Sequence, residues 1–182
     1  ATGEPRLRLE QAVLDAFAEG AALSRAADHF QPRPGQTEMA RAVARTIESG
    51  GVLVVEGGPG VGKTFSYLVP ALLSGERVLL STATKTLQDQ LHGRDLPRLV
   101  EALNLPVRTA LLKGRGSYLC LHRMEMARRD AALPDRTAVR TLATVEEWSQ
   151  ATRTGDLAEM QGLDERSPVI PLVTSTRGDC LG

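Results

Sequence analysis

Apolar residues in the first fifty positions recur at helical spacing and predict two helices. The first helix is amphipathic and ends near Gly20, with apolar positions four residues apart at Leu9, Val13 and Phe17. A break follows at residues 32–35, where two prolines and a glycine interrupt the chain. The second helix begins at Gln36, and its apolar stripe consists of Met39, Val43 and Ile47. Both helices are therefore expected to bury one face.

Three short apolar runs further along the chain have the character of buried strands. They occupy residues 52–56, 77–82 and 108–112, and the first two are followed by helical patterns over residues 63–73 and 85–91. Strands that alternate with helices predict an α/β fold with a parallel sheet and right-handed connections. Beyond Gly116 the pattern becomes mainly helical, over residues 118–129 and 139–152, and then loses its periodicity. A second, smaller module is expected there.

Composition places the chain among ordinary soluble globular proteins. Hydrophobic residues make up 42% of the chain and charged residues 24%, and the formal net charge is zero. No apolar run reaches the length of a membrane span and no signal segment opens the chain, so a cytoplasmic protein without a membrane partner is expected. Basic residues are concentrated in residues 107–129, which hold six of them against one acid. This stretch is either a track for phosphates or a solvated helix face.

The clearest local motif is the segment Gly57–Thr64, which reads G-x-x-x-x-G-K-T directly after the first predicted strand. Glycines allow successive N–H groups to converge on phosphate oxygens, and the helix that follows adds the positive end of its dipole. Lys63 is expected to reach the β- and γ-phosphates, and Thr64 is expected to ligate Mg²⁺. The sequence therefore predicts a site for a nucleoside triphosphate.

Two further features bear on ligands. Gln36 lies in a turn upstream of the P-loop, where its amide could pair with the edge of adenine, or could be an exposed side chain at a helix start. The second predicted strand ends in small hydroxyl residues and one cation, Ser81 to Lys85, at the sheet edge where α/β folds bind ligands. These residues could hold a sugar-phosphate backbone, or Thr82 or Thr84 could cap the next helix.

The chain has two cysteines, Cys120 and Cys180. A structural disulfide is not expected in a reducing cytosol, and no close Cys pair or Cys/His pair shows zinc-finger spacing. From spacing alone, two unrelated buried thiols are favoured over metal ligands.

Five sequence blocks occur in an order that is typical of one family. They are residues 33–36 (RPGQ), the P-loop, residues 80–91, residues 112–120 (LKGRGSYLC) and residues 172–182. Together they resemble the amino-terminal part of bacterial DinG/XPD-type superfamily 2 DNA helicases, in particular the YoaA branch. The resemblance covers the chain from about residue 31 onward. Its Lys-Gly-Arg-x-x-Tyr-Leu-Cys block is much more specific than the P-loop.

The resemblance implies an ATP-dependent DNA helicase that moves 5′ to 3′. It implies a helical extension at residues 1–30, the first part of a RecA-like motor domain at 31–115, and the start of an inserted iron–sulfur domain at 116–182. The implied ligands are ATP with Mg²⁺ and a 4Fe-4S cluster held by Cys120, Cys180 and two further cysteines. The implied partners are single-stranded or forked DNA, and replisome proteins such as single-strand-binding proteins and the clamp-loader chi subunit.

The residues implied for each role form three groups. Catalysis is assigned to Lys63 and Thr64. The nucleotide-binding group consists of Arg33, Gln36, Gly57, Gly58, Gly60, Val61, Gly62, Lys63, Thr64 and Phe65. The DNA-binding group consists of Ser81, Thr82, Thr84, Lys85, Gln90, Lys113 and Arg115, with Arg123 contributing from the basic stretch.

The P-loop departs from the family pattern at residues 58–61 but keeps its glycines. By the resemblance, two more cluster cysteines, an Asp-Glu-Ala-His box and a second motor domain are expected beyond Gly182, so the chain alone is expected to bind nucleotide without fast turnover. Two alternatives are open. One is a small P-loop phosphotransferase, although such enzymes open almost directly with the P-loop strand. The other is a nucleotide- or DNA-binding module without catalysis.

Overall fold

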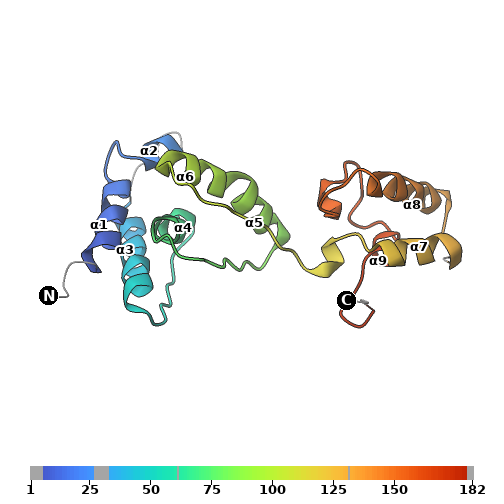
Figure 1. Cartoon of the computed structure of the whole chain (residues 1–182), viewed down its shortest axis with the longest axis horizontal. Coiled ribbons are helices and arrows are strands. Elements are labelled where there is room, and N and C mark those ends of the chain that lie inside the picture. Colours follow the sequence, from blue (N-terminus) through green and yellow to red (C-terminus); the bar gives the residue numbers. More distant parts are fainter. Residues whose placement is uncertain (1–5, 27–32, 61, 131, 180–182) are drawn as a thin grey trace. The chain divides into compact units, whose positions relative to one another are not determined.

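The computed structural model describes residues 6–26, 33–60, 62–130 and 132–179 (Figure 1). The chain divides into two compact units, Ala1–Leu111 and Leu112–Gly182, and each has its own hydrophobic core. Both units are built mainly from helices joined by irregular segments.

The first unit has six α-helices among its described residues. They are α1 (Arg6–Phe17), α2 (Leu23–Ala26), α3 (Pro34–Ser49), α4 (Lys63–Leu73), α5 (Lys85–Gln90) and α6 (Leu96–Leu103). A π-helical turn, η1 (Leu91–Asp95), joins α5 to α6. Local sequence explains two of the helix ends. The Thr84 hydroxyl caps α5 by accepting a hydrogen bond from the Leu87 N–H (3.2 Å), and Asn104 ends α6 in the left-handed conformation.

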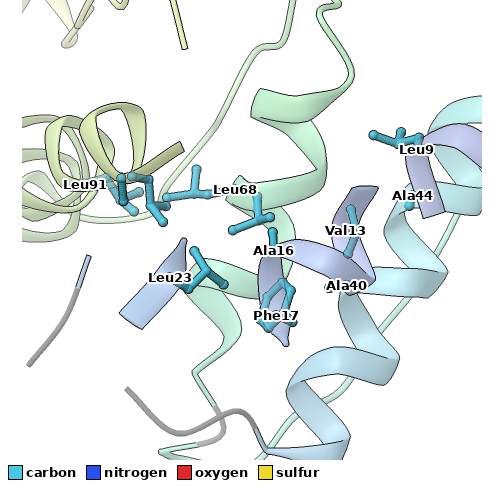
Figure 2. Packing of buried hydrophobic residues seen from close by; sticks show 12 residues of the cluster. Leu9, Val13, Ala16, Phe17, Leu23, Ala40, Ala44, Leu68 and Leu91 are labelled. Carbon is cyan, nitrogen blue, oxygen red and sulfur yellow. The ribbon is translucent and has the colours of Figure 1, made fainter. Parts of the chain in front are cut away.

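One hydrophobic cluster holds these helices together. Side chains from α1, α3 and α4 converge in it, and Leu91 joins them from η1 (Figure 2). Val13 of α1, Leu68 of α4 and Leu99 of α6 are fully buried. Burial of one such side chain contributes about 1.5–3 kcal/mol. The cluster therefore fixes α4, the helix that follows the P-loop, against its neighbours.

The helix α3 buries a different face from the predicted one. Its buried side chains are Gln36, Ala40 and Ala44, whereas Ile47 of the predicted stripe is exposed. Small side chains allow neighbouring helices to approach closely, and the two alanines face the cluster that includes α1 and α4. The helix was predicted correctly, but its buried stripe lies one residue further along.

The predicted parallel sheet is not present in the described residues, so the α/β, RecA-like fold class is wrong for this structure. Residues 52–56, 78–82 and 108–112 form neither helix nor strand. Val52 and Val54 are 93% and 90% exposed, and Leu53 and Val55 are 38% and 41% exposed. This alternation is typical of an extended backbone with no neighbouring strand to cover either face. The prediction that the apolar runs are strands is therefore wrong for the described residues. Pairing depends on a partner strand, and these residues form only one isolated bridge, Tyr118 with Asp156.

Charged side chains fasten α1 to α3 on the outside of the first unit. The Glu10 carboxylate lies 2.7 Å from the guanidinium groups of both Arg41 and Arg45. Hydrogen bonds from Arg45, and then from Arg41, lower the pKa of Glu10 from 4.5 to about 2. The Leu9 N–H also donates to the Glu48 carboxylate (3.0 Å). The first helix is thus held by apolar packing on one side and by charge on the other.

The second unit consists of short helices around a separate cluster. They are η2 (Arg115–Ser117), α7 (Leu121–Asp130), α8 (Arg136–Ser149), η3 (Leu157–Glu159) and α9 (Ile170–Val173). Asp135 caps α8 by accepting from the Ala138 N–H (2.8 Å), and Val145 and Val173 are fully buried in the core. The two longer helices match the predicted ones with ends moved by up to three residues. Within the described ranges, no helix combines the length and apolar character needed to cross a membrane.

Candidate functional site

The P-loop connects the exposed apolar run at residues 52–56 to α4, which begins at Lys63. Gly60 and Gly62 have positive φ angles of 77° and 84°. Side chains of L-residues disfavour such angles, so the loop needs glycine at both positions. Val61, which was predicted to contact the nucleotide, lies outside the described residues.

Gln36 ties the P-loop to α3. Its side-chain Nε2 donates a hydrogen bond to the Gly62 carbonyl (3.1 Å), and the residue is only 4% exposed. The backbone carbonyl of Gln36 accepts from the buried Ser66 hydroxyl of α4 (3.0 Å). A Cβ added to Gly62 would lie 2.2 Å from Gln36 Nε2, so a side chain at position 62 would displace this amide. Gln36 is thus a strut between loop and helix, and its predicted contact with adenine stays a prediction.

Arg33 is exposed and makes a second side-chain contact with the P-loop. Its guanidinium donates a hydrogen bond to the Gly60 carbonyl. Arg33 also lines an open hollow of about 540 Å³ that reaches from α3 to Leu14 of α1. The structure therefore brings Arg33 and Gln36 to two different glycines of one loop.

Lys63 is folded back onto the loop that precedes it. Its Nζ donates hydrogen bonds to the carbonyls of Gly57 (2.7 Å) and Gly58 (2.9 Å). Both acceptors are neutral, and in the part of the chain that the structure describes Lys63 forms no ion pair with a carboxylate. An anionic oxygen attracts an ammonium by its charge as well as through the hydrogen bond, and a neutral carbonyl lacks that charge. The cation is therefore held in a way that a phosphate can replace.

Thr64 and Phe65 occupy the first turn of α4 in different surroundings. Phe65 packs against the hydrophobic cluster, so its predicted nucleotide contact stays a prediction. The Thr64 hydroxyl is half-buried and hydrogen-bonds with the Tyr67 phenol one turn further along α4. Burial raises the pKa of Tyr67, the Thr64 hydrogen bond lowers it, and the Asp95 carboxylate raises it. Thr64 thus connects the loop to a half-buried tyrosine.

The residues of the first unit that were predicted to contact DNA lie in the turn before α5 and in α5 itself. Thr84 is the helix cap described above, and Thr82 Oγ1 donates a hydrogen bond to the Thr84 carbonyl (3.4 Å). Ser81 and Lys85 are exposed. The side chain of Gln90 donates to the Asp95 carboxylate (3.1 Å). The capping role considered for Thr84 is realised, while Ser81 and Lys85 are left accessible to a ligand.

The basic stretch of the second unit does not form one continuous track. Lys113 Nζ lies 2.7 Å from the Asp156 carboxylate, with side chains only 3% and 9% exposed. Arg123 pairs with Asp179 (3.2 Å) and donates to the Pro171 carbonyl (3.0 Å). Arg115 is exposed on η2. Two of the three predicted cations are therefore engaged inside the unit, and their DNA contacts stay predictions.

Cys120 precedes α7 and carries a free, half-buried thiol. Its N–H donates to the Val173 carbonyl (2.7 Å), and its carbonyl accepts from the Met124 N–H (2.9 Å). Cys180, the second predicted cluster ligand, lies outside the described residues. Among the residues that are described, no three His, Cys, Asp or Glu side chains are grouped to hold a metal. The iron–sulfur cluster stays a prediction.

Comparison with known proteins identifies relatives along most of the chain. It is 44% identical over 173 residues to the ATP-dependent DNA helicase YoaA of Haemophilus influenzae, and 45% identical over 173 residues to YoaA of Escherichia coli. These alignments cover 95% and 93% of the chain. The ATP-dependent helicase DinG of Mycobacterium tuberculosis is 40% identical over 172 residues, covering 82% of the chain. The chain belongs to the YoaA/DinG family.

The family resemblance predicted from the sequence blocks is therefore confirmed. The chain spans 27% of the length of each of the two YoaA helicases and 26% of that of the DinG helicase. No family model matches the chain.

Four residues of this YoaA/DinG chain that shape the candidate site were not predicted. They are Ser66, Tyr67, Asp95 and Asp156. Ser66 lies four residues after Gly62 on the predicted helix, a spacing that places both on one helix face and could have indicated a contact with the loop. The acids Asp95 and Asp156 belong to no motif. Asp95 takes its partners from its own helical segment, whereas the pairing of Asp156 with Lys113 is set by the tertiary fold.

Proposed function

We propose that the chain is the ATP-binding portion of a DNA helicase, in which ATP hydrolysis drives movement along single-stranded DNA. The observation that carries the proposal is the set of contacts around the P-loop. The Lys63 ammonium donates to two backbone carbonyls that a phosphate can replace, while Gln36 and Arg33 hold the loop by hydrogen bonds. The relatives support it, because they are ATP-dependent helicases.

In this proposal the triphosphate displaces the Lys63 ammonium from the loop carbonyls of Gly57 and Gly58. The gain is an ion pair between the ammonium and a phosphate in place of two hydrogen bonds to uncharged acceptors. Thr64 supplies a hydroxyl oxygen to Mg²⁺, and the positive end of α4 faces the phosphates. Hydrolysis also needs a group that orients water and an arginine that stabilises the developing charge. We assign neither role to a described residue, so the contribution of this chain is binding.

Single-stranded DNA is proposed to contact the turn before α5 and the first residue of that helix. Ser81 and Lys85 are exposed there, and Arg115 is exposed in the second unit. Hydroxyls and cations bind phosphates without reading bases, so binding is expected to depend on salt and little on sequence. Replisome proteins remain expected partners by resemblance alone.

Cys120 can supply one of the four thiolate ligands of a 4Fe-4S cluster. Its thiol is free and half-buried, and its backbone is fixed between Val173 and Met124. Cys180 is the second thiol of the chain, and a cluster of this kind needs four thiolates. When bound, the cluster would cross-link the segments that carry its ligands and add folding energy. We therefore propose Cys120 and Cys180 as two of its four ligands.

The decisive experiment is Lys63→Ala in the full-length protein, with ATP turnover and single-stranded DNA binding measured side by side. We expect turnover to fall by a factor of 100 or more, on the order of 3 kcal/mol of transition-state stabilisation, while DNA binding persists. Arg98→Ala, which removes an exposed cation from α6, is the matched control and should leave both unchanged. Normal DNA-stimulated turnover in Lys63→Ala would refute the nucleotide site. Turnover that never responds to DNA would favour the phosphotransferase.

A second experiment separates the two roles of Gln36. A strut that holds the loop should matter equally for ATP and for inorganic triphosphate, whereas a side chain that reads adenine should matter for ATP alone. Because the Gln36 amide is bound to Gly62, we expect Gln36→Ala to weaken both ligands by similar factors. A loss confined to ATP would establish the adenine contact instead.

A further inference from the structure

One arginine of α7 binds the segment of the second unit that leads to Cys180. Arg123 Nη1 lies 3.2 Å from Asp179 Oδ2, and Arg123 Nη2 donates a hydrogen bond to the Pro171 carbonyl (3.0 Å). A guanidinium presents several N–H groups in a fixed fork, so a single side chain can hold two acceptors at once. Arg123 therefore joins the first turn of α7 to two points of the segment that begins with α9.

The second carboxylate oxygen of Asp179 closes a local turn. Asp179 Oδ1 accepts hydrogen bonds from the Thr176 N–H and from the Thr176 hydroxyl (2.9 Å). Aspartate side chains commonly stabilise turns by binding nearby backbone N–H groups. Both oxygens of this carboxylate are thus engaged, one by its own turn and the other by α7. The ion pair with Arg123 sets where the whole turn lies relative to α7.

Cys120 is held at the same end of α7. Its N–H donates to the carbonyl of Val173, the fully buried last residue of α9 (2.7 Å). Arg123 follows Cys120 by three residues, and Asp179 directly precedes Cys180. The chain from Val173 to Asp179 is therefore tied at both ends to the same short stretch that carries Cys120.

We propose that Arg123 and Asp179 are positioning residues that bring Cys180 close to Cys120 before the iron–sulfur cluster is assembled. The inference rests on the proposed assignment of these cysteines as cluster ligands. Ligands on a loose segment lose conformational freedom when they bind a common group, and that loss weakens binding. A segment that is already fixed in the cluster-free protein avoids most of this cost.

The charges also predict how large the effect is. The side chains of Arg123 and Asp179 are 29% and 35% exposed, so water and salt weaken their attraction. We therefore expect a contribution of a few-fold and not the loss of the cluster. The proposal also gives Arg123 a role that does not require DNA.

The test uses two measurements on the full-length protein without DNA. In cluster-free protein, a short thiol-specific cross-linker joins Cys120 to Cys180, and mass spectrometry of the joined peptides gives the rate. In cluster-bearing protein, the visible absorption of the cluster follows the removal of iron by a chelator. Arg123→Gln and Asp179→Asn should each slow the cross-link and speed the loss of iron by about three- to fivefold. The double variant should change no more than either single one.

Two further variants separate positioning from a general effect on the fold. Arg123→Lys keeps a cation opposite Asp179 and should recover most of the effect. Arg129→Gln removes an exposed cation that pairs with Glu125 on the same helix, and it should behave as the wild type. The exchange rate of the Leu119 amide, which donates to a carbonyl inside the second unit, should be the same in every variant.

Wild-type rates in both Arg123→Gln and Asp179→Asn would overturn the inference, while a cluster in the wild type would leave the proposed ligands standing. Faster exchange of Leu119 in both variants would also overturn it, because the effect would then be a loss of folding. A wild-type protein that takes up no iron would defeat the proposed cluster itself, and the inference with it.

Discussion

Lys63 and Lys113 were both predicted to bind phosphates, and the structure gives them opposite surroundings. The Lys63 ammonium is half-buried and donates to two neutral backbone carbonyls. The Lys113 ammonium is 3% exposed and lies 2.7 Å from the Asp156 carboxylate. A neutral acceptor leaves the charge of a lysine unbalanced, whereas a buried carboxylate balances it and makes separation costly. The difference teaches that a basic residue in a motif is available to a ligand only when its partner in the fold binds it less strongly than the ligand does.

The Lys113 pair also has a structural task that Lys63 lacks. Asp156 accepts a hydrogen bond from the Ala158 N–H (3.1 Å), and the Lys113 N–H donates to the Tyr118 hydroxyl (2.9 Å). Tyr118 in turn forms the isolated bridge with Asp156. Lys113 therefore anchors the entry of the second unit to its η3 turn.

The largest effect is expected when one member of this buried pair is removed. Lys113→Met leaves the Asp156 carboxylate buried without its cation, which should destabilise the second unit by about 3–5 kcal/mol. Hydrogen exchange of the Leu119 amide, which donates to the Gly155 carbonyl beside Asp156, reports the opening free energy of this unit. The double variant Lys113→Met/Asp156→Leu should recover most of the loss because no charge remains buried.

An exposed pair in the same unit provides the control for this first prediction. Arg128 and Glu146 are 2.7 Å apart with side chains 53% and 36% exposed. Arg128→Met should therefore cost less than about 1 kcal/mol. Equal losses for Lys113→Met and Arg128→Met would show that burial does not distinguish the two pairs.

Features that depend on residues close together in the sequence could be predicted, whereas features that depend on contacts between distant residues could not. The helices α1, α4 and α8 depend on local periodicity and caps, and they were predicted nearly in place. Whether the run at residues 52–56 pairs with another strand, and whether Lys113 meets Asp156 forty-three residues later, depends on the whole fold. The P-loop was found because its glycines, lysine and threonine act within eight residues. Its strut Gln36 was found only as an adenine contact, since nothing local indicates a bond to Gly62.

The second prediction concerns the loop that keeps Lys63 available. Gly62→Ala places a methyl group where Gln36 Nε2 now lies and forces an L-residue to a φ of 84°. We expect the Kd for ATP to rise at least tenfold, roughly 1.4 kcal/mol, because the loop must leave its present course. Gly75→Ala carries the same kind of strain at a φ of 70° with nothing within 4 Å, and it should not affect ATP binding. Unchanged ATP affinity in Gly62→Ala would show that the hydrogen bond between Gln36 and Gly62 does not support ATP binding.

The third prediction extends the comparison to a solvent-accessible ion cluster. The pKa of Glu10 is lowered from 4.5 to about 2, so its contribution to stability is complete above pH 4.5 and is lost as the pH falls toward 2. Glu10→Gln should therefore weaken the attachment of α1 near neutral pH, and the difference from the wild type should vanish near pH 2. The effect is small because the arginine partners are exposed. Exchange of α1 amides across this pH range measures it, and a difference that does not depend on pH would contradict the role of the charge.

The smallest effect is a change in salt dependence, and it tests the comparison of cations most directly. Each phosphate contact to single-stranded DNA contributes about 0.7 to the slope of log K against log salt. Arg115→Gln removes an exposed cation and should lower the slope of the full-length protein by about that amount. The double variant Lys113→Met/Asp156→Leu removes a cation that already has its carboxylate, so its slope should equal that of the wild type. Fluorescence anisotropy of a labelled oligothymidine at several salt concentrations resolves the two cases. If the double variant lost as much slope as Arg115→Gln, Lys113 would leave Asp156 for the phosphate, and burial beside a carboxylate would no longer separate it from Lys63.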